Sequence, residues 1–491
     1  MKKSLLALTA LAATGLLTLA GCGGGTTSSS SSSAPASSSS SQAAGSSSTS
    51  TGVQPNGHHF NVRVWNDEFQ NRFKAYSTMF DHVDGDGNYV LKDGTTLVWS
   101  LVANKDNKYQ NELDKAIAAQ DTAAANDKID MFLVEADYAL KYSAQDIALD
   151  VKGDIGLTDE DLAQQYQYTK DILTYDNKIK GVSWQATPGL YAYRTDIADA
   201  VLGTHDPNAV QAKLADWDKF NAVAAEMKEK NYHMLAGKDD SYRTYSNNVT
   251  SKWATEDDEG TPTIHLDNNI RKWVKDTKNY ADKGYLAGLS DDYALWGTEW
   301  GNQQSKKGST FGFFWSTWGI NFSLQGYADP DKTGKATDDN LWGKYRVCYG
   351  PQSYYWGGTW MIGAKGTDDT ALIKQTMKDL TVDSTIMKKI TTDTQDYTNN
   401  KKAMKEIADS DYKSDFLGGQ NHIKLFTEAA DKISLKYISP YDQGCNEKFQ
   451  EAMKDYFAGS KTYAEAISNF KTLLKGVYAN AIFDTSFDTA I

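Results

Sequence analysis

The sequence contains few cysteines and histidines and has no excess of basic side chains. Its 491 residues include 3 Cys and 7 His, which leaves little from which a zinc site could be built. Lys and Arg total 51 against 64 Asp and Glu, so the formal net charge is −13. Proteins that bind nucleic acid need clustered basic side chains to displace counterions. The charge balance therefore argues against a nucleic-acid partner.

The sequence patterns of several enzyme and cofactor classes are also missing. The chain has no HExxH, GxSxG, P-loop, CxxC or dinucleotide-binding pattern. Residues 84–88 (DGDGN) begin like a calcium loop, but Tyr89 stands where the loop needs glycine and Thr95 where it needs a bidentate glutamate. We therefore predict a polar turn there, and no metal, nucleotide or other cofactor for the chain.

Aromatic residues, by contrast, are abundant. The 13 Trp, 28 Tyr and 17 Phe make up 12% of the chain, and every Trp lies between residues 65 and 360. The surplus by itself indicates either large cores or adhesive surfaces, because these side chains carry much apolar area.

The N-terminus is typical of an exported lipoprotein. Lys2 and Lys3 precede an uncharged, leucine-rich stretch, which predicts a signal peptide over residues 1–21. The residues LAGC that end at Cys22 resemble the lipobox of bacterial lipoproteins, in which the thiol receives diacylglycerol; the alternative is an ordinary signal with a chance cysteine. Residues 26–51 hold 15 Ser and 4 Thr, so residues 22–58 are predicted to be a lipid-anchored, flexible linker.

These features predict where the protein resides. No run of about 18 apolar residues follows the signal, so we expect no membrane span. The body is therefore expected outside the cytoplasm, held to the bacterial cell membrane by its lipid anchor.

The body alternates predicted strands and helices. Its first patterns occur at residues 60–65 (strand), 68–79 (helix), 95–102 (strand), 109–120 (helix) and 129–134 (strand). This order is typical of a parallel sheet flanked by helices. Further strands are predicted at residues 179–184, 190–193, 310–315, 345–349 and 359–364. From residue 369 the chain is almost wholly helical, and Thr462 with Glu465 has capping-box spacing. The body is too long for one sheet, so we predict two α/β lobes.

Several motifs occur in the order found in a known family. They are VWNDEF (64–69), KIDMFLVEAD (128–137), SWQATPGLYAYRTD (183–196), FFWSTW (313–318), GGTWM (357–361), YFAG (456–459) and TYAEAISNF (462–470). Through them, residues 60–475 resemble the carbohydrate-type extracellular solute-binding proteins (family 1, the maltodextrin-binding relatives) of ATP-binding-cassette (ABC) importers. No single motif is diagnostic; the resemblance rests on their order over nearly the whole mature chain.

The resemblance implies a two-lobed, periplasmic-binding-protein-like (type II) fold with a hinge between the lobes, mostly parallel sheets flanked by helices, and a helical C-terminus. Lobe one would comprise residues 59–185 and 352–396, and lobe two residues 186–351 and 397–491. The resemblance also implies a monomeric, non-enzymatic receptor. It would capture a carbohydrate, expected to be an oligosaccharide, by hinge closure and deliver it to the membrane subunits of an ABC transporter.

Candidate binding residues follow from the chemistry of a sugar. A sugar ring has an apolar C–H face and a rim of hydroxyls, so its recognition needs flat aromatic platforms and planar polar side chains. In α/β lobes such groups act at strand ends and in the adjoining loops. The predicted ligand-binding residues are Trp65, Asn66, Asp67, Glu68, Glu135, Asp137, Trp184, Gln185, Arg194, Trp296, Trp300, Trp315, Trp318, Trp356, Trp360, Asp442 and Gln443. Among them, Trp318 is the best candidate for a stacking platform.

Other roles are open for some of these residues. Asp67, Asp137 and Asp442 could equally cap the helices that follow them. Trp99 lies within a strand, where a core position and a ligand contact are equally compatible with the pattern. The tryptophans expected to pack rather than bind are Trp217, Trp253, Trp273 and Trp342.

Two further functions are compatible with the sequence. Glu68, Glu135 and Asp137 could supply the paired carboxylates of a membrane-tethered glycoside hydrolase, which lie about 5–9.5 Å apart. A glycan-adhesion module, which holds polymer without closing, is the other alternative.

The cysteines leave one structural question open. With Cys22 assigned to lipid, Cys348 and Cys445 are the remaining pair. In an exported protein they either form a disulfide or remain two buried thiols.

Overall fold

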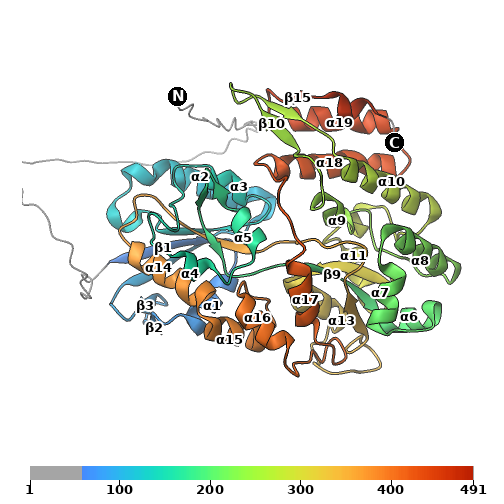
Figure 1. The fold of residues 1–491 in the computed structure, drawn as a ribbon, viewed down its shortest axis with the longest axis horizontal. Coiled ribbons are helices and arrows are strands. Elements are labelled where there is room, and N and C mark those ends of the chain that lie inside the picture. The colour runs from blue at the N-terminus through green and yellow to red at the C-terminus, as the bar shows by residue number, and fades with distance from the viewer. Residues whose placement is uncertain (1–57, 490–491) are drawn as a thin grey trace, which may run out of the picture. The chain divides into compact units, whose positions relative to one another are not determined.

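The computed structural model describes residues 58–489 (Figure 1). The predicted signal peptide, the predicted lipidation site Cys22 and all but the last residue of the predicted linker lie outside the described residues. Within residues 58–489, no helix is long and apolar enough to cross a membrane.

A seven-stranded sheet forms the first lobe. Its strands lie in the order β2 (Phe80–Val83), β3 (Tyr89–Leu91), β4 (Thr96–Leu101), β1 (His59–Val64), β5 (Met131–Glu135), β14 (Thr359–Gly363) and β8 (Val182–Ser183). β1 pairs in parallel with β4 and with β5. Along the chain, α1 (Glu68–Tyr76) lies between β1 and β4, and α2 (Lys108–Ala119) lies between β4 and β5, which confirms the predicted β-α-β-α-β unit. β14 enters antiparallel between β5 and β8. β5 is central because its apolar residues can be buried on both faces.

A three-stranded sheet forms the core of the second lobe, in the order β12 (Gly312–Ser316), β9 (Gly189–Arg194) and β13 (Tyr345–Cys348). Both outer strands run antiparallel to β9, whereas the sequence predicted mostly parallel sheets. The reason is topological. β9 leads out of a crossing between the lobes and β13 leads back to the next crossing, so the two strands run in opposite directions.

Smaller sheets and helices complete the chain. The smaller sheets are β10 (Ala254–Glu256), β11 (Pro262–Ile264) and β15 (Ile482–Phe483), and the pair β6 (Thr174–Tyr175) and β7 (Lys178–Ile179). The helices of residues 139–171 and 370–408 are α3 (Ala139–Ser143), α4 (Asp159–Leu162), α5 (Gln167–Asp171), α14 (Thr370–Met377), α15 (Ser384–Thr394) and α16 (Lys401–Ala408). The helices of residues 195–328 are α6 (Thr195–Leu202), α7 (Pro207–Leu214), α8 (Trp217–Glu229), α9 (Tyr242–Ser246), α10 (Asn268–Lys283), α11 (Thr298–Gln303), α12 (Thr317–Gly319) and α13 (Gln325–Ala328).

The C-terminal helices are α17 (His422–Ala430), α18 (Asp442–Phe457) and α19 (Tyr463–Lys475). The predicted capping box of α19 is confirmed. The Glu465 N–H donates to the Thr462 hydroxyl, and the Glu465 carboxylate accepts from the Thr462 N–H at 2.8 Å. The buried face of α19 carries Ala466, Ile467, Phe470 and Leu474, at helical spacing.

The chain crosses between the lobes through hydrogen-bonded segments that lie side by side, at residues 184–189, 354–356 and 397–399. The Gly189 N–H donates to the Tyr354 carbonyl at 2.7 Å, and the Ala186 N–H donates to the Tyr397 carbonyl at 3.1 Å. After the third segment, Asn400 donates to carbonyls of residues 381–382, and α16 packs against α15. α16 also packs against α17, which contacts β9 of the second lobe, so α16 lies between helices of both lobes.

Candidate functional site

A polar cavity of about 170 Å³ lies between the two lobes. Its first-lobe wall follows β5, and its second-lobe wall is formed by α9, by residues 434–438 and by the first turns of α18. The principal polar and apolar residues on its walls are Ala136, Asp137, Leu140, Arg243, Asn247, Tyr355, Asp442, Gln443, Asn446 and Glu447. Of the predicted ligand-binding residues, Asp137, Asp442 and Gln443 line this cavity directly.

A bidentate ion pair crosses the cavity from one lobe to the other. Asp137 follows β5, and Arg243 lies on α9; the guanidinium nitrogens are 2.8 Å and 2.6 Å from the two carboxylate oxygens. Burial by itself would raise the pKa of Asp137. The charge and hydrogen bonds of Arg243 lower this pKa by more than burial raises it, so the net shift is downward. Burial, with the nearby Asp137 charge, raises the pKa of Glu135. Asp137 is thus held as an anion by Arg243, beside a carboxyl group that resists ionisation.

Five tryptophans form a continuous cluster beside this ion pair, which we call the tryptophan cluster. Its members are Trp296, Trp300, Trp315, Trp318 and Trp356. Trp315 and Trp356 stack with ring centroids 5.3 Å apart and an interplanar angle of 5°, and Trp296 stacks on Trp318 at 6.1 Å and 20°. The Arg243 guanidinium lies 5.1 Å from the centroid of Trp356. This cation–π contact connects the cluster to the wall of the cavity.

Within the cluster, two indoles present surface and three support them. Trp296 is 54% exposed, and Trp318 is partly exposed, whereas Trp300, Trp315 and Trp356 are buried. Trp296 also has a φ of 71°, a left-handed conformation that is strained for a bulky residue. Strained backbone conformations of this kind are concentrated at functional sites, where the surrounding structure holds the residue in place. Trp296 and Trp318 are therefore the candidate stacking surfaces.

Hydrogen bonds fix the orientation of the buried indoles. The Trp300 Nε1–H donates to Asp240 at 2.6 Å, and the Trp315 Nε1–H donates to Gln304 at 3.0 Å. The Trp318 Nε1–H donates to the Trp356 carbonyl at 2.9 Å. Because each indole has only one donor, these bonds leave the ring faces as the surfaces available for contact.

Gly357 permits the close packing of Trp318. Its φ is 76°, and a Cβ built there would lie 2.7 Å from Trp318 Nε1 and 3.7 Å from Glu135 Oε1. Only glycine fits both the left-handed backbone and this approach. The GGTWM motif thus brings Trp318 next to the segment that carries Glu135.

The residues predicted at the end of β1 occupy a separate part of the first lobe. Trp65 is partly exposed and packs edge-on against Tyr109 and Tyr138, and Asn66 and Asp67 are exposed. Asp67 precedes α1 but makes no capping hydrogen bond with its side chain. None of these residues belongs to the lining of the cavity.

Glu68 and Gln185 lie together at the hinge. The Gln185 amide donates to Glu68 Oε1 at 3.2 Å. Burial, followed by the nearby Asp396 charge, raises the pKa of Glu68 to about 8. This pair can respond to movement of the first crossing, because Gln185 lies within that crossing segment.

Three of the predicted binding residues hold positions within the protein interior. Trp184 and Trp360 have no exposed surface, and the Trp360 Nε1–H donates to the Thr169 carbonyl at 2.8 Å. Arg194 is 5% exposed, and its guanidinium binds Asp196 at 2.6 Å and the Gly308 carbonyl. These side chains pack and brace the lobes in this structure, because being at a strand end placed them under the adjoining loops rather than in the cavity.

The remaining tryptophans pack. Trp217, Trp253 and Trp273 are buried as expected, and Trp342 packs edge-on against Phe416. Trp99 packs edge-on against Phe69, Phe73 and Tyr89, within the first lobe.

Asp442 and Gln443 open helix α18. The Ser439 hydroxyl donates to Asp442 at 2.6 Å, and the Gln443 amide donates to Glu447 at 3.0 Å. Burial raises the pKa of Asp442 to about 7.

The cavity also contains residues that the sequence reasoning missed. They are Arg243, Asn247, Tyr355 and Asn446. Asn247 accepts the Tyr355 N–H at 2.7 Å, and Asn446 accepts the Trp253 indole N–H at 2.9 Å. Tyr355 could have been found, because it adjoins the aromatic run that contains Trp356 and Trp360. No sequence pattern identifies Arg243 as a site residue, because α9 is a short helix of five residues in a polar stretch of the sequence.

The possible disulfide is not formed. Cys348 on β13 and Cys445 on α18 are both buried free thiols. The two cysteines belong to different packing layers of the second lobe, the sheet and the C-terminal helices, so the pairing is corrected to two separate core positions. Burial raises the pKa of Cys348 to about 12, which keeps the thiol protonated and unreactive.

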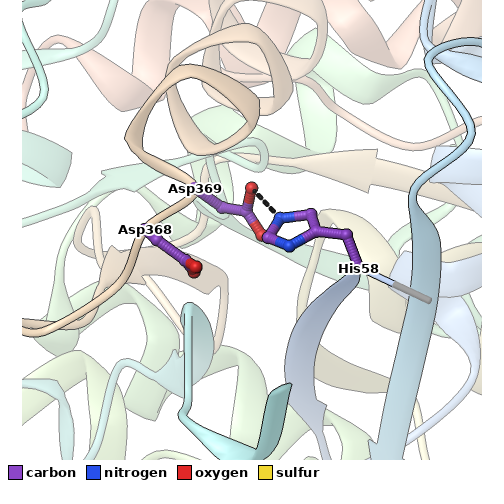
Figure 2. A group of neighbouring side chains, drawn as sticks. All are labelled: His58, Asp368 and Asp369. Atoms are coloured by element: carbon purple, nitrogen blue, oxygen red, sulfur yellow. Dashed lines mark hydrogen bonds and ion pairs between the residues drawn. The ribbon is translucent and has the colours of Figure 1, made fainter. Parts of the chain in front are cut away.

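One group of side chains elsewhere could hold a metal ion. His58, Asp368 and Asp369 offer ligand atoms within 4.8 Å of one another (Figure 2). His58 Nε2 is already hydrogen-bonded to Asp369 Oδ1 at 2.8 Å, and the hydrogen bond and charge of Asp369 outweigh burial to raise the pKa of His58. As observed, this ion pair fastens the start of β1 to the turn before α14.

The fold and the site between its lobes define a two-lobed solute-binding protein. The sequence profile of the family described as bacterial extracellular solute-binding protein matches residues 93–417. The chain belongs to this family.

Solved structures share this architecture. One, described as extracellular solute-binding protein family 1, has a TM-score of 0.66 at 15% identity, covering 85% of this chain and all of its own. An ABC-transporter-associated binding protein from B. animalis subsp. lactis Bl-04, in complex with beta-1,6-galactobiose, has a TM-score of 0.62 at 16% identity, covering 87% of this chain and 100% of its own. Maltose-bound MalE3 of T. maritima has a TM-score of 0.58 at 13% identity, covering 86% and 100%. Comparison with curated protein sequences gives no match. At these identities the likeness shows the fold.

Proposed function

We propose that this protein captures an oligosaccharide between its lobes and delivers it to the membrane subunits of an ABC transporter. The observation that carries the proposal is the exposed pair Trp296 and Trp318 beside a polar cavity bounded by both lobes. Indole faces suit the apolar side of a sugar ring, and the carboxylates and amides of the cavity suit its hydroxyls. The family membership and the sugars named for the similar structures support the same reading.

The proposed mechanism is a shift between open and closed forms. Sugar bound on one lobe gains contacts from the other, which favours closure about the hinge. The Asp137–Arg243 pair joins the two walls and contributes to the closed form. We propose lobes of residues 59–185 with 352–396 and of 186–351 with 397–491; the packing of α16 on α17, which contacts β9, supports the third boundary.

The proposed protein is a monomer anchored outside the cytoplasm by lipid on Cys22. The Ser-rich linker then gives the body the reach to meet a transporter in the same membrane. Radiolabelled palmitate incorporated into the wild type but not into Cys22→Ser tests the anchor.

A glycan panel tests the function. Tryptophan fluorescence and isothermal titration should detect binding of at least one oligosaccharide, and small-angle scattering should show compaction with it. Absence of both responses with every sugar and other small solute would overturn the proposal.

Recovery of the bound glycan separates the alternatives. Intact ligand supports a receptor, whereas released reducing ends would favour a glycoside hydrolase. Tighter binding to insoluble polysaccharide than to short oligomers would favour an adhesion module.

A further inference from the structure

Acidic side chains outnumber basic side chains on the walls of the cavity. Asp239, Asp442 and Glu447 lie on its second-lobe wall, and among the described residues none of the three forms an ion pair. Asp442 and Glu447 are hydrogen-bonded to neutral side chains, a serine hydroxyl and a glutamine amide. These carboxyl groups therefore have no cationic partner on the protein. Burial raises the pKa of each of them, so a cation bound beside them would favour their ionised form.

Nearby cations do not neutralise this wall. Lys238 and Lys454 lie near Asp239, but both form ion pairs with Asp291, at 3.6 Å and 3.2 Å. The charge of Lys252 acts on Asp442, but Lys252 is exposed and forms no ion pair with it. These carboxyl groups are thus available to a cationic ligand in the cavity.

The lining of the cavity does not supply free positive charge either. Arg243 is the sole basic side chain in the described lining, and Asp137 engages both of its terminal nitrogens. Glu135, whose side chain accepts the Asp137 N–H, lies next to this pair and supplies no positive charge. A ligand carboxylate would therefore have to displace Asp137 or remain without a cationic partner among acidic groups, which is costly in a partly dehydrated site.

We infer that the cavity selects saccharides by charge: it accepts neutral sugars, favours those that carry an amine, and rejects uronic acids. The inference rests on the proposed function and names the ligand class of the same site. An ammonium group can pair with Asp442, Glu447 or Asp239, and the exposed indole faces of Trp296 and Trp318 attract cations as well. A carboxylate finds neither contact.

Matched disaccharides test the inference by titration calorimetry on the intact chain. The β-1,4 series is cellobiose, the glucosamine dimer and cellobiouronic acid; the α-1,4 series is maltose with its 2-amino-2-deoxy and 6-carboxylate analogues. We expect the amine to bind at least about threefold tighter than the neutral sugar, and the acid at least about tenfold weaker. The differences should shrink at 1 M salt, where the screening length is about 3 Å.

Variants locate the effect. Asp442→Asn and Glu447→Gln should each narrow the difference in affinity between amine and acid by about threefold, by removing one carboxyl group that can pair with an ammonium. Asp455→Asn, on the same helix but outside the cavity lining, is the matched control and should leave this difference unchanged. The salt titration on the wild-type chain keeps the inference testable if a variant is unstable.

The outcomes separate the inference from the proposed function. A neutral sugar that binds while its uronic counterpart binds equally or more tightly overturns charge selection alone. If no sugar of either series or of the glycan panel binds, the proposed function fails and the inference fails with it.

Discussion

The tryptophan cluster and the tryptophans of the seven-stranded sheet differ in what surrounds their rings. In the cluster, Trp315 and Trp356 stack on each other and support Trp296 and Trp318, whose faces reach the surface. In the sheet, Trp184 and Trp360 are buried, and Trp65 packs edge-on against tyrosines. A strand end is thus not enough to make an aromatic platform: an indole stays accessible where other indoles fill the space behind it and a loop does not cover it.

The largest effect should come from removing a supporting ring of the cluster. Trp315 has no exposed surface, so Trp315→Ala should lower the free energy of unfolding by about 3–5 kcal/mol, through lost burial and the cavity left behind. Urea denaturation followed by circular dichroism measures it. Trp315→Phe, which retains a ring, should cost less. A loss below about 1 kcal/mol for Trp315→Ala would mean that the cluster is not a packed unit.

An exposed ring of the cluster should act on binding instead. Trp296→Ala and Trp296→Gly both remove the indole and should weaken the best-binding oligosaccharide about tenfold, the size of one lost stacking contact. Glycine suits the φ of 71°, so the Gly variant should be more stable than the Ala variant by roughly 1 kcal/mol. Calorimetric titration and thermal melting separate the two effects. Unchanged affinity in both variants would remove Trp296 from the site.

A tryptophan of the sheet provides the contrast. Trp65→Ala should change the affinity for the same sugar less than about threefold, because the indole packs on Tyr109 and Tyr138 outside the cavity, while stability falls by roughly 1–2 kcal/mol. An affinity loss as large as that of Trp296→Ala would show that the first lobe also supplies a platform.

The smallest effect concerns pH and the polar wall beside the cluster. Burial raises the pKa of Asp442 from 3.8 to about 7, so between these pH values the folded protein holds a proton that the unfolded chain has lost. This contribution to stability is complete below about pH 4 and is lost as the pH rises to about 7. Asp442→Asn should flatten that part of the profile by less than about 1 kcal/mol, since the group is partly exposed and screened by solvent.

Thermal melting from pH 4 to 8 measures this dependence. Asp455→Asn on the same helix is the control and should retain the wild-type slope. An Asp442→Asn profile as steep as that of the wild type would assign the slope to other carboxyl groups, such as Glu68.

Much of the fold was predictable because its signals are local. The first β-α-β-α-β unit and the capping box of α19 depend on short periodic patterns and on residues three apart, and both are confirmed. The antiparallel second sheet was not predicted, because strand direction there depends on where the chain crosses between lobes. The free state of Cys348 and Cys445 likewise depends on layers that the sequence does not locate.

The candidate site was predictable only in part. Asp137, Asp442 and Gln443 follow from their places after a strand and before a helix, and they line the cavity. Arg243 did not follow, because its importance arises from facing Asp137 across more than a hundred residues of chain. Trp184, Trp360 and Arg194 also lie in or beside strands, and the sequence does not show that they are buried away from the tryptophan cluster.

The sequence alone determined the class of the protein: an exported, acidic, aromatic-rich α/β chain with motifs in the order of a solute-binding family. Composition, periodicity and motif order are properties of the sequence itself, so they can be recognised without a structure. The tertiary structure decided which aromatic and acidic side chains share a surface. That depends on contacts between distant segments, and it turned a general excess of tryptophan into two exposed indoles beside a cavity lined by unpaired carboxyl groups.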